Sequence, residues 1–88
     1  MFDAIDIKDV KVELGKLIKV LRKSRKLSQA ALAKRLDVSR TTIQNLELGK
    51  NSTNETLFKV LKELNQLNKL YDSINAYKTQ VTNTKPLY

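Results

Sequence analysis

A row of hydrogen-bonding side chains lies in the middle of the sequence, where Arg40, Thr41, Gln44 and Asn45 follow one another closely. Arginine can bond two acceptors of guanine, an amide can bond the donor and acceptor of adenine, and threonine can contact the thymine methyl group. Threonine and asparagine form helices less well than lysine, glutamate or alanine, so mere surface filler is the weaker explanation of this row. The row therefore predicts a helix that reads base pairs in the major groove of DNA.

The composition leaves few other chemistries open. The 88 residues include no cysteine and no histidine, which removes disulfides, the usual zinc ligands and the common nucleophile–base pairs. We interpret Asp3, Asp6, Asp9 and Glu13 as helix-dipole partners and solvated charges rather than a catalytic cluster. We therefore predict no enzyme activity, no cofactor and no metal site.

The positive charge is concentrated around the polar row. The chain has a net charge of +8, and residues 14–50 hold ten basic side chains but only two acidic ones, Asp37 and Glu47, whereas the flanks cancel. Such a concentration favours a polyanion partner, above all nucleic acid. No apolar run reaches membrane-spanning length, and the acidic N-terminal segment does not resemble a signal peptide. These features predict a cytoplasmic protein without a membrane partner.

Helical spacing of apolar residues predicts an all-α fold of five helices that would position the row. The predicted helices cover about residues 10–24, 28–37, 39–48, 54–64 and, as a shorter element, 66–77. Asp9, Ser28 and Ser39 are the predicted N-caps, and Gly49 is predicted to end the third helix. The predicted organisation is an N-terminal arm at 1–9, a domain at 10–77 and a flexible tail at 78–88. The arm alternates Ile5 and Ile7 with charges, so a dimer-exchanged strand and a disordered arm both stay open.

The segment LSQAALAKRLDVSRTTIQNLELGK resembles the helix-turn-helix of the lambda-repressor-like (Cro/Xre) family, and the similarity extends over about residues 14–64. This resemblance implies a compact five-helix DNA-binding domain that acts as a dimer. Asp37 departs from the family pattern, because it occupies a turn position where glycine is usual; aspartate tolerates the left-handed conformation at a cost of order 1 kcal/mol.

The resemblance also assigns roles to individual residues. It implies a structural pair, Arg22 with Glu47, which would tie the first helix to the third. It gives the base-reading role to Arg40, Thr41, Gln44 and Asn45, and phosphate contacts to Gln29, Ser39, Lys50, Asn51 and Ser52.

A further apolar stripe continues beyond the fourth helix at Leu67, Leu70, Tyr71 and Ile74. A short helix is not stable in isolation, so this face has to be covered. We predict that it forms the dimer interface. The alternative is that the helix folds back and completes the core of its own domain, and both roles are compatible.

The leading functional hypothesis is a repressor that binds a palindromic operator as a homodimer, in a bacterium or a phage. Residues 53–74 are similar to the C-terminal part of HipB-like antitoxin regulators, which adds the hypothesis of an antitoxin from a HipBA-like operon with a HipA-like kinase toxin as partner. Phage-type repressors and restriction-modification controller proteins share the same size and motif, so they remain alternatives without a toxin.

Overall fold

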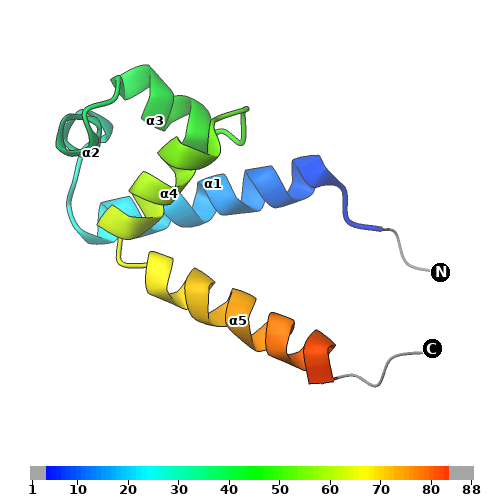
Figure 1. Cartoon of the computed structure of the whole chain (residues 1–88). Helices are drawn as coiled ribbons and strands as arrows, with labels where there is room; N and C mark the ends of the chain where they lie inside the picture. The colour runs from blue at the N-terminus through cyan, green and yellow to red at the C-terminus, as the bar shows by residue number, and fades with distance from the viewer. Residues whose placement is uncertain (1–3, 84–88) are drawn as a thin grey trace.

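The computed structural model describes residues 4–83 and contains five helices, with no strand in that range. The helices are α1 (Ile7–Ser24), α2 (Gln29–Leu36), α3 (Arg40–Glu47), α4 (Asn54–Glu63) and α5 (Leu67–Asn83). Helices α2 and α3 lie at one end of the molecule, and the free ends of α1 and α5 point away from them (Figure 1). The predicted all-α fold of five helices is confirmed for the described residues.

The first helix begins earlier than predicted. Its N-cap is Asp6, not Asp9: Asp6 accepts a bond from the N–H of Ile7, and Asp6 and Asp9 form a reciprocal capping box, with 2.9 Å from the Asp6 N–H to the Asp9 carboxylate. The two aspartates are spaced as this motif requires, so the earlier one begins the helix. Residues 7–9 of the predicted arm are therefore helical, and a strand through Ile7 is wrong. Residues 1–3 lie outside the described part.

The turns at the ends of α2 and α3 have the caps and left-handed residues that the sequence predicts. Ser28 and Ser39 are the N-caps of α2 and α3, as predicted. Asp37 adopts the left-handed conformation with φ 56° and ψ 46°, so the turn between α2 and α3 tolerates aspartate in place of glycine. Gly49 follows α3 with φ 76°.

A small core joins the first four helices. It is centred on five fully buried side chains from these helices and the residue that follows α4: Ile18, Leu32, Ile43, Val60 and Leu64. Helix α1 crosses α3 so closely that a Cβ at Gly15 would lie 2.7 Å from the carbonyl oxygen of Leu46 and nearer still to that of Glu47. Gly15, which costs α1 some helix propensity, therefore permits the contact that fixes α3.

The fifth helix takes no part in this core. All of α5 is at least partly exposed, so the alternative that it completes the core of its own domain is wrong. It also continues to Asn83, well beyond the predicted end at residue 77; within the predicted tail 78–88, residues 84–88 lie outside the described part. No helix in residues 4–83 has the length and apolarity needed to cross a bilayer.

Candidate nucleic-acid interface

Helix α3 presents the polar row on its outer side. Ile43 and Leu46 are buried against α1 and α2, so the opposite face of α3 points toward solvent. Three of the four predicted base-reading side chains are exposed, namely Arg40, Thr41 and Gln44, whereas Asn45 is half-buried. The Ser39 hydroxyl accepts the N–H of Thr42 at 3.1 Å and contacts the Thr42 hydroxyl at 2.7 Å, so it is engaged in capping the helix.

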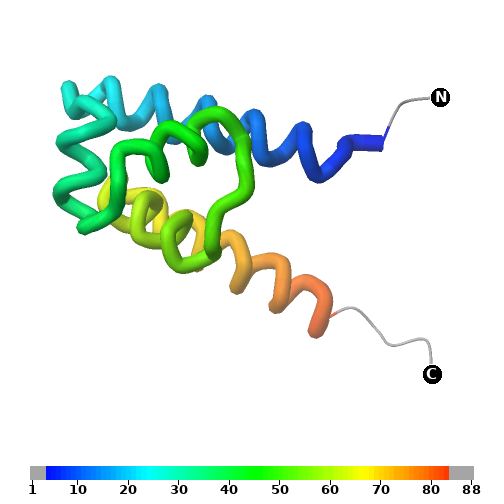
Figure 2. Tube along the Cα trace, turned by 90° about the horizontal axis from the view of Figure 1, so that it is seen from above, coloured from blue at the N-terminus to red at the C-terminus, as the bar shows by residue number. Residues whose placement is uncertain are grey.

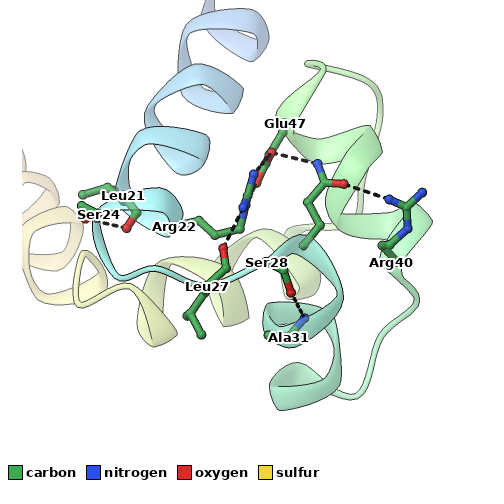
Figure 3. A network of polar contacts seen from close by, with 9 residues as sticks. Leu21, Arg22, Ser24, Leu27, Ser28, Ala31, Arg40 and Glu47 are labelled. Atoms are coloured by element: carbon green, nitrogen blue, oxygen red, sulfur yellow. Dashed lines mark hydrogen bonds and ion pairs between the residues drawn. The ribbon is translucent and has the colours of Figure 1, made fainter.

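A buried ion pair fixes the inner end of α3 to α1. Arg22 Nε donates to one carboxylate oxygen of Glu47 at 2.6 Å and Nη2 donates to the other at 3.0 Å, and both residues are buried. Arg22 Nη1 also donates to the carbonyl oxygen of Leu27 at 2.7 Å (Figure 3). This two-point geometry ties the first helix to the last turn of the third, which is the role that the family resemblance implied for this pair.

The charges of the pair support each other. Burial alone would raise the pKa of Glu47, but hydrogen bonds from Arg22 and Gln29, together with the positive charges of Arg22 and Lys19, outweigh it and hold the pKa below its usual value. The hydrogen bond to Glu47 raises the pKa of Arg22, against the smaller opposing effect of burial. Both groups therefore stay charged near neutral pH.

Gln29 connects this buried pair to the outer face of α3. Its amide nitrogen donates to Glu47 Oε1 at 3.0 Å, and its amide oxygen accepts a long hydrogen bond of 3.3 Å from Arg40 Nη1. A continuous polar chain thus runs from Arg22 to Arg40 (Figure 3). The family resemblance implied a phosphate contact for Gln29 but not this link, because only the folded chain brings together residues so far apart in the sequence.

The loop after α3 forms a second part of the surface. Lys50, Asn51 and Ser52 are exposed between α3 and α4, and the Asn51 side chain accepts a hydrogen bond from Lys11 of α1. The Lys50 N–H donates to the carbonyl oxygen of Asn45 at 2.9 Å, which holds the start of the loop against the end of α3. The predicted phosphate-contacting loop is thus continuous with the end of the polar row.

Two arginines of the basic segment 14–50 form contacts with α4. Arg25 donates to the carbonyl oxygen of Glu63, and Arg35 pairs with the Glu63 carboxylate at 2.9 Å. Glu63 is half-buried and paired, because α4 brings it against α2. Of these two contacts only the pair of Arg35 with Glu63 offsets a positive charge, and the Arg35 side chain remains 55% exposed.

The acidic residues near the N-terminus do not assemble into a site. Asp6 and Asp9 form the capping box, Glu13 pairs with Lys16 on the surface, and Asp3 lies outside the described residues. Residues 4–83 contain no group of three or more acidic, histidine or cysteine side chains suited to a metal ion.

A family model described as helix-turn-helix matches residues 18–68, which is more than half of the chain and includes all of α2, α3 and α4. No curated protein matches the chain.

Proposed function

Because the chain belongs to the helix-turn-helix family of Cro/C1 type, a family of DNA-binding transcription regulators, we propose that it is a sequence-specific repressor that binds a palindromic operator as a homodimer. Helix α3 would lie in the major groove, with Arg40, Thr41, Gln44 and Asn45 toward base edges. Gln29, Ser39, Lys50, Asn51 and Ser52 would contact the phosphate backbone on either side.

The observation that carries this proposal is the division of α3 into two faces. Ile43 and Leu46 are fully or nearly fully buried, while Arg40, Thr41 and Gln44 are exposed on the same two-turn helix. Burying a face fixes the orientation of the opposite one, which is what reading a base pair by side-chain hydrogen bonds requires.

Dimerisation is part of the proposal because one copy has a single recognition helix. A two-fold pair would place two such helices in successive major grooves about one helical turn apart, and this spacing would match a palindrome. Leu67, Leu70, Tyr71 and Ile74 of α5 are the proposed contact residues. Tyr71 is 67% exposed and Ile74 is 55% exposed in the single chain, so this face is accessible to a partner.

The finer proposal is that the chain is an antitoxin of a HipBA-like operon, and it rests on the resemblance of residues 53–74 to HipB-like regulators. Its partner would be a HipA-like kinase toxin. Phage-type repressors and restriction-modification controllers are the alternatives. Co-expression with the product of the adjacent gene, followed by co-purification and a growth assay, separates these readings: a kinase that binds this chain and is toxic without it supports the antitoxin.

Selection of binding sites from a random double-stranded library tests the main proposal. We expect enrichment of a palindrome, two chains bound per site, and an affinity that falls steeply with salt, with a slope of roughly −0.9 per phosphate contacted. Arg40→Ala should lose discrimination at one base pair per half-site, by roughly 1–3 kcal/mol. The absence of any enriched sequence, or an affinity that does not depend on salt, would contradict the proposal.

A further inference from the structure

Helix α5 carries an apolar stripe with one positive charge inside it. Tyr77 and Val81 extend the predicted contact face by another two turns and are 71% and 70% exposed. Lys78 follows Ile74 by four residues and precedes Val81 by three, so it lies on the same face of the helix. The stripe from Leu67 to Val81 thus extends over about 21 Å of helix and has a cation near its C-terminal end.

Helix α1 carries the complementary surface. An apolar groove lies along its N-terminal half, lined by Ile5, Val10, Leu14 and Leu17, with the carboxylates of Asp9 and Glu13 beside them. Ile5, Val10 and Leu17 are exposed in the single chain. Asp9 is part of the capping box and Glu13 pairs with Lys16, but both carboxylates are exposed. A groove with this acidic border fits an apolar helix that carries a lysine.

The two surfaces of one chain do not cover each other. Helix α5 packs mainly on α4, and the C-terminal part of α5 and the N-terminal part of α1 diverge in both views (Figures 1 and 2). Both surfaces are therefore accessible to another molecule, and a second copy of the chain supplies a match for each.

We propose that α5 of a second copy lies along the α1 groove, and that the contact is repeated in reverse by the two-fold axis. The apolar side chains of α5 then cover Val10 and Leu17, and Lys78 of one copy approaches Asp9 and Glu13 of the other. Helices of 18 and 17 residues have matching lengths for such a contact. This inference rests on the homodimer of the proposed function and names α1, rather than a second α5, as the partner of the stripe.

Two large surfaces per copy also suit a stable dimer. A specific interface buries about 800 Å² on each partner, which requires several large apolar side chains. Tyr71, Ile74, Tyr77 and Val81 from one helix meet Val10 and Leu17 from the other, and a two-fold axis makes every contact twice.

Single cysteines test the geometry, since the natural chain contains none. One preparation carries Val10→Cys and a second, distinguished by a mass tag, carries Ile74→Cys; the two are mixed, allowed to exchange subunits and treated with a short bismaleimide. Because each chain has one thiol, a link between differently tagged chains reports contact of α1 with the α5 of another copy. Lys8→Cys mixed with Ile74→Cys is the matched control, because Lys8 is exposed on the opposite side of α1.

We expect the mixture of Val10→Cys with Ile74→Cys to form linked dimers at least several times faster than the mixture of Lys8→Cys with Ile74→Cys. It should also form them faster than either Val10→Cys or Ile74→Cys links with itself. Charge exchange gives a second readout: Glu13→Lys or Lys78→Glu should raise the dimer dissociation constant roughly two- to fivefold, and the double variant should restore it. Circular dichroism verifies that each variant is folded.

Rapid linking of Ile74→Cys with itself, without preference for Val10, would overturn the inference in favour of α5 pairing with α5. Equal linking of the Val10 and Lys8 mixtures would overturn it as well. Either linking result would contradict only the contact of α1 with α5, and the proposal of a dimer that binds an operator would stand. Failure to select an operator would contradict the proposed function but not this contact.

Discussion

Arg22 and Glu47 are joined by two hydrogen bonds of 2.6 and 3.0 Å inside the domain, between the last turn of α1 and the last residue of α3. The pair is buried, and Gln29 occupies a further acceptor position of the same carboxylate. A buried charge that loses its partner is far more costly than an exposed one. The orientation of the candidate recognition helix therefore depends on two buried side chains that are not part of its exposed polar face.

Replacement of Glu47 by alanine should destabilise the domain strongly. The substitution leaves the buried guanidinium of Arg22 with only the Leu27 carbonyl as a partner, and breaking such a pair costs roughly 3–5 kcal/mol. Asp72→Ala on the exposed surface of α5 is the control and should change stability by less than about 0.5 kcal/mol. Urea unfolding followed by circular dichroism measures both, and equal midpoints would contradict a structural role for the pair.

The same pair predicts a dependence of stability on acid. The folded-state pKa of Glu47 lies below its value in the unfolded chain, so the unfolded state takes up the proton first as pH falls. The stabilisation by Glu47 is fully present above the unfolded pKa, about 4.3, and is lost as pH falls through the lower folded value. Arg22 stays protonated throughout this range.

The difference in unfolding free energy between the natural chain and Glu47→Gln measures this effect. It should be constant from pH 7 down to about 5 and should shrink below about pH 4.3. A difference that stays unchanged down to pH 2 would show that the carboxylate charge does not stabilise the fold.

Much of the fold follows from local signals in the sequence, and the parts that do not are those that depend on packing. Ser28, Ser39 and Asp37 indicate the boundaries of α2 and α3 because capping and left-handed turns are decided by a few neighbouring residues. The start of α1 was misplaced because Asp6 and Asp9 are both competent caps, and only their reciprocal bonds decide between them.

The candidate site was predictable in its residue types but not in its connections. Arg40 and Gln44 were recognisable by their chemistry on a short helix. The bonds of Gln29 to Glu47 and Arg40, and the engagement of Glu63 by Arg35, link distant segments and follow only from the crossing of the helices. The predicted α5 ends too early because residues 78–83 are polar apart from Val81, and one apolar residue gives little periodic signal.

Replacement of Gly15 by alanine should change the stability of the domain in the direction opposite to that usual for a helix. Alanine normally stabilises a helix by about 1 kcal/mol relative to glycine. Here the added Cβ would meet the carbonyl oxygens of Leu46 and Glu47 well inside contact distance, and backbone atoms cannot rotate away. Gly15→Ala should therefore destabilise the domain by roughly 1–3 kcal/mol and separate α1 from α3.

Ser73→Ala in exposed α5 is the control for this substitution, because it adds helix propensity without a close neighbour and should be neutral or slightly stabilising. Thermal unfolding compares the two. A melting temperature for Gly15→Ala at or above that of the natural chain would show that α1 and α3 approach less closely than the structure indicates.

The last prediction concerns how Gln29 acts on DNA recognition. Its amide bridges the buried Glu47 carboxylate and the exposed guanidinium of Arg40, so it restricts the positions that Arg40 can occupy before DNA binds. Gln29→Ala should cost about 0.5–1.5 kcal/mol of folding stability through the lost hydrogen bond to Glu47. It should also reduce discrimination at the base pair that Arg40 reads, because the arginine then has to be ordered upon binding.

A double-mutant cycle separates this positioning effect from a phosphate contact made by Gln29 itself. Binding of Gln29→Ala, Arg40→Ala and the double variant is measured on the selected operator and on operators altered at one base pair. If Gln29 acts through Arg40, its substitution changes base preference in the natural background and has little further effect once Arg40 is alanine. If Gln29 acts only on phosphate, both backgrounds lose the same affinity on every sequence, and the salt slope falls by about one contact. The second pattern would contradict the positioning role and assign Gln29 to the DNA backbone alone.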